Sequence, residues 1–212
     1  MKLVTIILYD FDELSVESKI KAIEDFRFFN LDHDWWEFLL EHFKGLVASI
    51  GIETELKHIS FSGFYSQGSG SGYSGSINFQ YLLQSIQLES WKKYAPNLEL
   101  KLPLPKFKKM VLSQIEKGSI EFVPSIENSN RETDIKVITD FQINSHTTRH
   151  YPNIESEMQK IGEWVSKIAT QLNSYLFRSL RDEYDYLTSD ESIKDTIEAN
   201  EYYFTVDGKI AT

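Results

Sequence analysis

The 212-residue chain contains no cysteine. Without thiols, a disulfide scaffold, a thiolate zinc site, an iron–sulfur cluster and a cysteine nucleophile are all excluded. A covalent mechanism would have to use a hydroxyl, a lysine or a carboxylate. The absence of cysteine therefore removes several enzyme classes before any motif is considered.

The sequence also lacks long hydrophobic runs. No apolar stretch approaches the roughly 20 residues that a membrane-spanning helix needs. The apolar N-terminal segment runs directly into Asp10 and Asp12, which is unlike a secretory signal peptide. We therefore expect a cytoplasmic protein with no membrane partner.

Basic residues are in deficit, with 22 Lys and Arg against 32 Asp and Glu, a net charge of −10. This balance argues against direct nucleic-acid binding over an extended surface. The acids are concentrated in residues 10–43 and 181–212, whereas residues 92–117 hold seven lysines and two glutamates. Aromatic residues make up 14% of the chain, and burying them requires a globular fold.

The apolar pattern switches between periods of two and 3.6 residues, which predicts an α+β fold. Period-two segments predict a mostly antiparallel sheet from residues 2–9, 52–64, 76–81, 119–123 and 134–143, with 2–9 as a central strand. A helical hairpin over 15–50 and one long helix over 154–187 would pack on this sheet. With no linker visible, we expect a single domain over residues 1–212. The predicted core residues are Ile6, Ile23, Phe61, Phe79, Ile138, Trp164 and Ile168.

Helix starts are marked by short polar residues. Ser15 precedes the first helical stripe, Asp34 lies three residues before Glu37, and Thr188 lies three residues before Glu191. Each pattern is typical of an N-cap or a capping box.

The most unusual segment is a glycine- and serine-rich turn between two predicted strands. It consists of Ser66, Gln67, Gly68, Ser69, Gly70, Ser71 and Gly72. Successive backbone N–H groups and hydroxyls could bind a phosphate, with the lysines of 92–117 neutralising its charge. A phosphate-binding loop, however, needs a following helix and a nearby lysine, and here a strand is predicted instead. Two interpretations of this segment therefore stay open: a hairpin turn without a ligand, and a loop that binds a nucleotide-like ligand.

His146 and His150 are four residues apart, the spacing of two metal ligands on one face of a helix. Thr147, Thr148 and Pro152 disfavour that helix. The sequence therefore predicts no metal site and no cofactor.

Acids at the end of the first predicted strand, Asp10, Asp12 and Glu13, could bind a cation, although acids before a helix start are also favoured by the helix dipole. No spacing places a nucleophile beside a histidine, so no catalytic residue is predicted.

A partner-binding surface is predicted on the acid-rich helices of 15–50, together with the acid-rich tail. Its residues are Glu24, Asp25, Trp35, Trp36, Glu37 and Glu41. Large aromatic residues dominate interface hot spots, although a wide buried helix face would also explain the two tryptophans. Acidic helices of this kind would bind a basic protein surface.

Five segments of the chain resemble a known family. They are Phe11–Ser15, Asp34–Glu37, Ser60–Gly70, Tyr186–Glu191 and Asn200–Gly208. These segments are similar to a phage-encoded family described as the N-terminal part of the antitoxin of a toxin–antitoxin stability system. Residues 92–150 are not matched, and the family tends to carry Asp where this chain has Ser69. The resemblance implies a mobile-element protein that acts by binding, in the cytoplasm of a host cell, with no catalytic residue to carry over.

Taken with the acidic surface, this resemblance favours a non-enzymatic accessory protein that neutralises a toxin or a host defence factor. The alternative is a protein that binds or hydrolyses a nucleotide-like ligand at residues 66–72.

Overall fold

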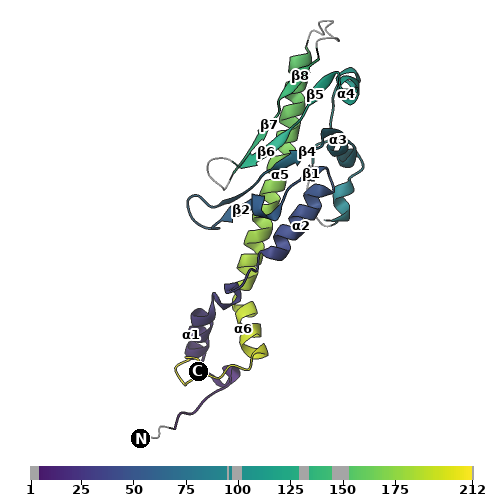
Figure 1. Cartoon of the computed structure of the whole chain (residues 1–212). Helices are drawn as coiled ribbons and strands as arrows, with labels where there is room; N and C mark the ends of the chain where they lie inside the picture. The colour runs from purple at the N-terminus through teal and green to yellow at the C-terminus, as the bar shows by residue number, and fades with distance from the viewer. Residues whose placement is uncertain (1–4, 95, 97–101, 129–133, 145–152, 212) are drawn as a thin grey trace. The chain divides into compact units, whose positions relative to one another are not determined.

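A computed structural model of the chain describes residues 5–94, 96, 102–128, 134–144 and 153–211 (Figure 1). The chain divides into two compact units. Unit 1 comprises Met1–Glu37 and Leu180–Thr212, and unit 2 comprises Phe38–Ser179. The expected single domain stays a prediction, because compact units joined by a continuous helix can unfold together or separately.

Unit 2 contains three small antiparallel sheets. The largest has the order β1-β4-β6-β7, built from β1 (Ile52–Glu53), β4 (Gly75–Ile77), β6 (Ser125–Asn128) and β7 (Ile135–Ile138). Two further pairs are β2 (Ile59–Ser62) with β3 (Gly70–Tyr73), and β5 (Ile120–Phe122) with β8 (Phe141–Ile143). The predicted α+β class with antiparallel pairing is confirmed.

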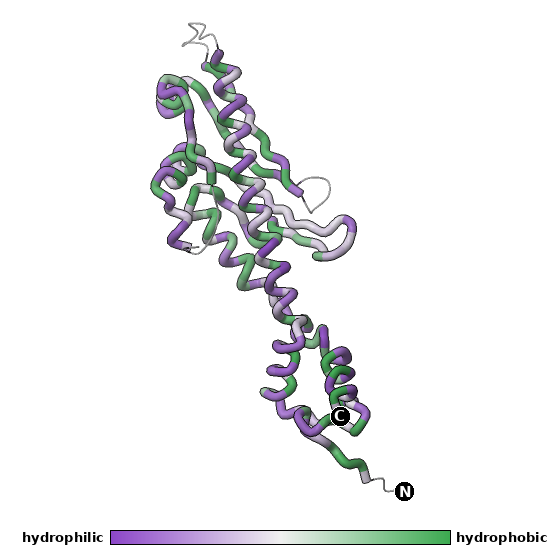
Figure 2. The backbone as a smooth tube through the Cα atoms, turned by 180° about the vertical axis from the view of Figure 1, so that it is seen from behind, coloured by the Kyte–Doolittle hydropathy of each residue, from purple (hydrophilic) through white to green (hydrophobic). Residues whose placement is uncertain are grey.

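Helices accompany these strands in unit 2. They are α2 (Glu37–Ala48), α3 (Phe79–Gln87), α4 (Lys109–Glu116) and α5 (Ile154–Leu187), with the short 3-10 helices η3 (Leu56–His58) and η4 (Ser90–Lys93). The first residue of α2 and the last eight residues of α5, from Leu180, belong to unit 1. Figure 1 shows α5 lying along the strands of this unit, and Figure 2 shows apolar and polar residues alternating along it. Its residues Ile161, Trp164, Val165, Ile168, Leu172 and Leu176 are buried. The long helix therefore has the predicted bounds and the predicted buried face.

The predicted central strand at residues 2–9 is wrong for the part that the structure describes. Residues 5–8 form no strand, and Ile6 and Ile7 are 63% and 68% exposed. Only Tyr9 makes a β-bridge there, to Phe204. A run of β-branched residues needs a neighbouring strand to become a sheet, and the sequence does not specify that neighbour.

Three other predicted strands are interrupted, among them 134–143, which divides into β7 and β8 of different sheets. The segment 52–64 is split by η3, so β1 and β2 belong to different sheets. In the segment 76–81, the Asn78 side chain accepts a hydrogen bond from the Tyr81 N–H at 3.0 Å and caps α3. Phe79 and Tyr81 are therefore helical, because the cap satisfies a free N–H of the first turn.

The predicted helical hairpin of 15–50 is also wrong. Its first helix, α1 (Val16–Phe26), lies in unit 1 and packs against α6 (Asp190–Ala199), whereas α2 lies almost entirely in unit 2. The Ser15 cap is confirmed, with its Oγ 3.2 Å from the Ser18 nitrogen. Helix α6 is capped by Ser189 rather than Thr188.

The predicted core is confirmed in part. Phe79, Trp164 and Ile168 are buried. Ile23, Phe61 and Ile138 are half-buried, and Ile6 is exposed.

Candidate partner-binding surface on unit 1

Unit 1 is assembled from both ends of the chain. Its elements are the 3-10 helix η1 (Phe11–Glu13), α1, the 3-10 helix η2 (Phe29–Leu31), α6 and the segment after α6. Their buried side chains form one cluster of Phe11, Leu14, Ala22, Phe26, Ile193, Ile197 and Phe204. This cluster fixes the C-terminal segment on α1, so residues distant in sequence share one surface.

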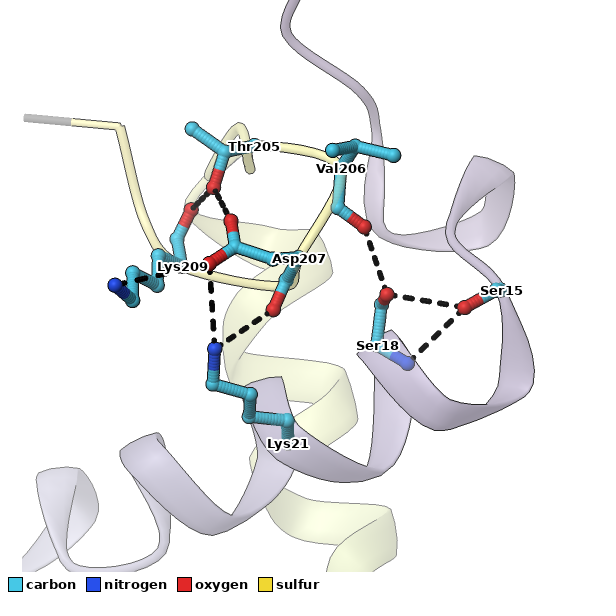
Figure 3. Close-up of polar contacts among 7 residues, drawn as sticks. All are labelled: Ser15, Ser18, Lys21, Thr205, Val206, Asp207 and Lys209. Carbon is cyan, nitrogen blue, oxygen red and sulfur yellow. Dashed lines mark hydrogen bonds and ion pairs between the residues drawn. The ribbon is translucent and has the colours of Figure 1, made fainter.

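Polar contacts hold the C-terminal segment in place (Figure 3). The Ser18 hydroxyl donates to the Val206 carbonyl at 2.8 Å, and the Lys21 ammonium donates to the Asp207 carbonyl at 2.9 Å. The Thr205 hydroxyl donates to the Asp207 carboxylate and lowers its pKa below the ordinary value. Gly208 has a φ of +78°, and a Cβ there would clash with the Ser18 carbonyl oxygen.

The segment after α1 is fixed to α6 by a second set of contacts. The Arg27 guanidinium donates to the Thr188 carbonyl at 2.9 Å and pairs with Asp190 at 2.8 Å. The Asn30 amide donates to the Ser192 hydroxyl at 3.1 Å and accepts from the Thr196 hydroxyl at 2.9 Å. These contacts hold η2 against α6.

An aromatic cleft of about 410 Å³ opens between α1, η2 and the C-terminal segment. Its lining is Asp25, Phe26, Phe28, Phe29, Asp32, Tyr202 and Ile210. The ring centroid of Phe26 lies 5.4 Å from that of Phe29 and 5.4 Å from that of Tyr202. The Phe29 and Tyr202 rings meet edge to face, with their centroids 6.0 Å apart. Asp25 and Asp32 are exposed and form no ion pair with any residue that the structure describes.

An acidic cleft of about 450 Å³ shares Tyr202 with the aromatic cleft. It is lined by Asp10, Phe11, Asp12, Glu13, Ile197, Glu198, Glu201, Tyr202 and Tyr203. Lys19 pairs with Asp12 at 3.6 Å, and Lys194 pairs with Glu198 at 3.2 Å, a contact that raises the pKa of Lys194. Two of its five carboxylates are thus neutralised.

The net charge of the chain is carried by unit 1. Unit 1 holds 18 acidic and 7 basic residues, a net charge of −11, whereas unit 2 holds 14 acidic and 15 basic residues, a net charge of +1. A cationic ligand would therefore be attracted to unit 1.

The predicted partner-binding residues do not all belong to this unit. Glu24, Asp25 and Glu37 are exposed in unit 1, whereas Glu41 is exposed in unit 2, where its carboxylate lies 3.5 Å from Lys44. Of these acids, only Asp25 lines the aromatic cleft.

The two predicted tryptophans are half-buried in a turn before α2 rather than on a helix. The Trp35 ring lies 5.6 Å from that of Trp36 and 6.2 Å from that of Tyr184. Part of each indole is therefore engaged within the chain.

Sequence analysis missed the residues that complete the aromatic cleft. Phe28 and Phe29 are 60% and 41% exposed, although Phe26, two residues before Phe28, is buried. Two adjacent exposed phenylalanines are unusual and can mark an interaction site. The cluster of three phenylalanines in four residues was the available signal. The residues around Tyr202 in the sequence gave no indication that its ring would pack beside these phenylalanines.

The glycine- and serine-rich segment divides into a strand and a turn. Gly70, Ser71 and Gly72 lie in β3, and the buried Ser71 hydroxyl donates to the Asn173 side-chain oxygen at 2.9 Å. In the remaining turn, Ser66, Gln67 and Gly68 are exposed and Ser69 is half-buried, and the Ser69 hydroxyl donates to the Ser66 carbonyl at 2.7 Å. In this segment a positive φ occurs at Gly68, not at Gly70 or Gly72. A ligand at this turn stays a prediction.

The described residues offer no group of three or more His, Asp or Glu side chains arranged to hold a metal ion. His146 and His150 lie outside the described residues. None of the described helices combines the length and the apolar character needed to cross a membrane.

Comparison with known proteins places most of the chain in one family. Residues 35–190 match the model of a domain of unknown function, DUF8835. No curated protein and no solved structure matches the chain significantly. The match covers unit 2 and the adjoining ends of unit 1, whereas α1 and most of α6 lie outside it. Because the model matches more than half of its length, the chain belongs to the DUF8835 family.

Proposed function

We propose that the chain is a non-enzymatic binding protein, which uses unit 1 to hold a basic surface of a partner protein. Following the resemblance to a phage-encoded antitoxin-like family, we propose that the partner is a toxin or a host defence factor. Binding to such a partner would take place in the host cell cytoplasm. Neutralisation then consists of covering a surface that the partner needs for its own ligand.

The distribution of charge is the observation that supports this proposal. Unit 1 carries a net charge of −11 and unit 2 a net charge of +1. An excess of one sign within one unit of a protein destabilises that unit by self-repulsion and accelerates association with an oppositely charged partner. A binding role gives a reason for the charge that stability alone does not give.

Capture from a host lysate at low salt tests the proposal. We expect the immobilised wild-type chain to retain a basic protein that elutes as salt is raised, because salt screens exposed charges. The test variant replaces Glu24, Glu37 and Asp195 of unit 1 by Lys, and all three side chains are exposed. This variant should lose the captured protein.

The matched control replaces Glu53, Glu116 and Glu121 of unit 2 by Lys, which changes the net charge of the chain by the same amount. This control should capture the protein as the wild type does. Equal losses in both variants, or no capture by the wild type at low salt, would contradict the proposal.

A further inference from the structure

We infer that the aromatic cleft of unit 1 takes an arginine side chain from a basic segment of the partner protein. This inference rests on the proposed function and names the group that the partner contributes. It is carried by the chemistry of the cleft lining, which combines aromatic faces with two carboxylates.

The aromatic walls explain why the ligand group should be flat and cationic. Phe26, Phe29 and Tyr202 have ring centroids within 6.0 Å of one another, and Phe28 adds a ring that is 60% exposed. The face of an aromatic ring attracts a cation, and the planar, weakly hydrated guanidinium stacks on it more readily than an ammonium does.

The carboxylates explain why a neutral apolar group fits less well. Asp25 and Asp32 line the same cleft and form no ion pair with the residues described. An apolar ligand would remove water from these carboxylates without replacing its hydrogen bonds, and that desolvation is unfavourable. A guanidinium supplies N–H donors and a compensating charge at the same place.

The cleft is held open by contacts that need no ligand. Arg27 and Asn30 fix η2 to α6, while Ser18 and Lys21 fix the C-terminal segment to α1. A preformed site avoids the entropic cost of ordering its walls on binding.

Two short peptides test the inference on the full-length chain by amide NMR titration. The probe is acetyl-Gly-Arg-Gly-amide, and its control carries citrulline, which has nearly the same shape without the charge. We expect the arginine peptide to shift the amide signals of Asp25, Phe28, Asp32 and Tyr202, and to bind at least about tenfold more tightly than the citrulline peptide. Equal binding of the two peptides would overturn the inference.

Two variants locate the binding. Phe28→Leu keeps the apolar bulk but removes an aromatic face, and Asp32→Asn removes a charge at nearly constant shape. Both side chains are exposed, so the fold should persist, and each change should weaken arginine-peptide binding by about 2- to 5-fold. Phe38→Leu is the control, because Phe38 is 77% exposed and lies in unit 2. Unchanged binding in both cleft variants would overturn the inference.

The peptide titration and the lysate capture test the inference and the proposed function separately. If the cleft variants bind the peptide as the wild type does, while the Glu24, Glu37 and Asp195 variant loses the captured protein, the inference fails and the proposed function stands. If arginine binds the cleft as expected but no protein is captured, the cleft is an arginine site and the proposed function fails.

Discussion

At the scale of single residues, the surroundings of an acidic side chain decide whether it contributes to stability or remains available for binding. Glu157 of α5 is only 2% exposed, and its Oε1 accepts the Lys108 N–H at 3.0 Å. This hydrogen bond, supported by Lys160 at 3.3 Å, lowers the pKa of Glu157. The exposed Asp25 and Asp32 of unit 1 have no comparable partners among the described residues.

The contribution of Glu157 should depend on pH. Because its pKa is lower in the folded chain than the ordinary value of about 4.3, the ionised side chain stabilises the fold above that pH. This stabilisation is lost as the pH falls through the folded pKa. Replacing Glu157 by Gln should therefore cost about 1–3 kcal/mol at pH 7, and the difference from the wild type should shrink in acid.

Urea unfolding between neutral and acidic pH measures this difference. Glu163→Gln is the matched control, since Glu163 lies on the same helix and is exposed. A cost for Glu157→Gln that does not change with pH would contradict the assignment.

Burial also decides how much an isoleucine contributes to the free energy of unfolding, as a comparison of two isoleucines shows. Ile168 is fully buried on α5, whereas Ile6 is 63% exposed. Ile168→Ala should lower the free energy of unfolding by about 2–5 kcal/mol. Ile6→Ala should lower it by less than about 0.5 kcal/mol, and a larger loss in denaturant unfolding would show that residues 5–8 are packed after all.

At the scale of elements, α5 anchors the β2–β3 hairpin through side-chain hydrogen bonds. The Ser71 hydroxyl donates to the Asn173 side chain, which in turn donates to the Ser71 carbonyl at 2.8 Å. The Tyr73 hydroxyl donates to the Ala169 carbonyl at 3.3 Å, and its burial raises the pKa of the phenol. These contacts give the glycine-rich strand a structural role.

Removing the Ser71 hydroxyl should test that role. Ser71→Ala leaves the Asn173 oxygen without this donor and should cost about 1–2 kcal/mol in urea unfolding. The control is Ser76→Ala on β4, whose side chain is exposed, and which should stay within about 0.5 kcal/mol of the wild type. Equal costs for the two variants would argue against an anchoring role.

The same elements show what could be predicted from the sequence. Helix α5 was predictable because 34 residues repeat one apolar period. The segment 2–9 was not, since a strand depends on a neighbour that local sequence does not specify. The residues at 76–81 were misread because Asn78 suits both a turn and a helix cap.

The candidate site was likewise predictable from the sequence only in part. The excess of acids near both ends of the chain was readable from composition. The aromatic cleft was not, because Phe29 and Tyr202 meet only when the two ends of the chain fold together.

At the scale of the whole molecule, the excess charge and the family match fall on different parts of the chain. The DUF8835 match spans residues 35–190 and contains all of unit 2, while the net charge of −11 belongs to unit 1. Under the proposed function, unit 2 is an α+β framework and unit 1 supplies the contacts with the partner. Charge-driven association of this kind should respond strongly to salt and to charge reversal in unit 1.

The most direct test is the dissociation constant between the chain and its captured partner, measured at ionic strengths between about 0.05 and 0.3 M. The wild-type affinity should fall steeply with salt. At the lowest salt, the Glu24, Glu37 and Asp195 variant should bind at least about tenfold more weakly, while the Glu53, Glu116 and Glu121 control should bind like the wild type. An affinity that is insensitive to salt, or that falls equally in both variants, would contradict a binding role for unit 1.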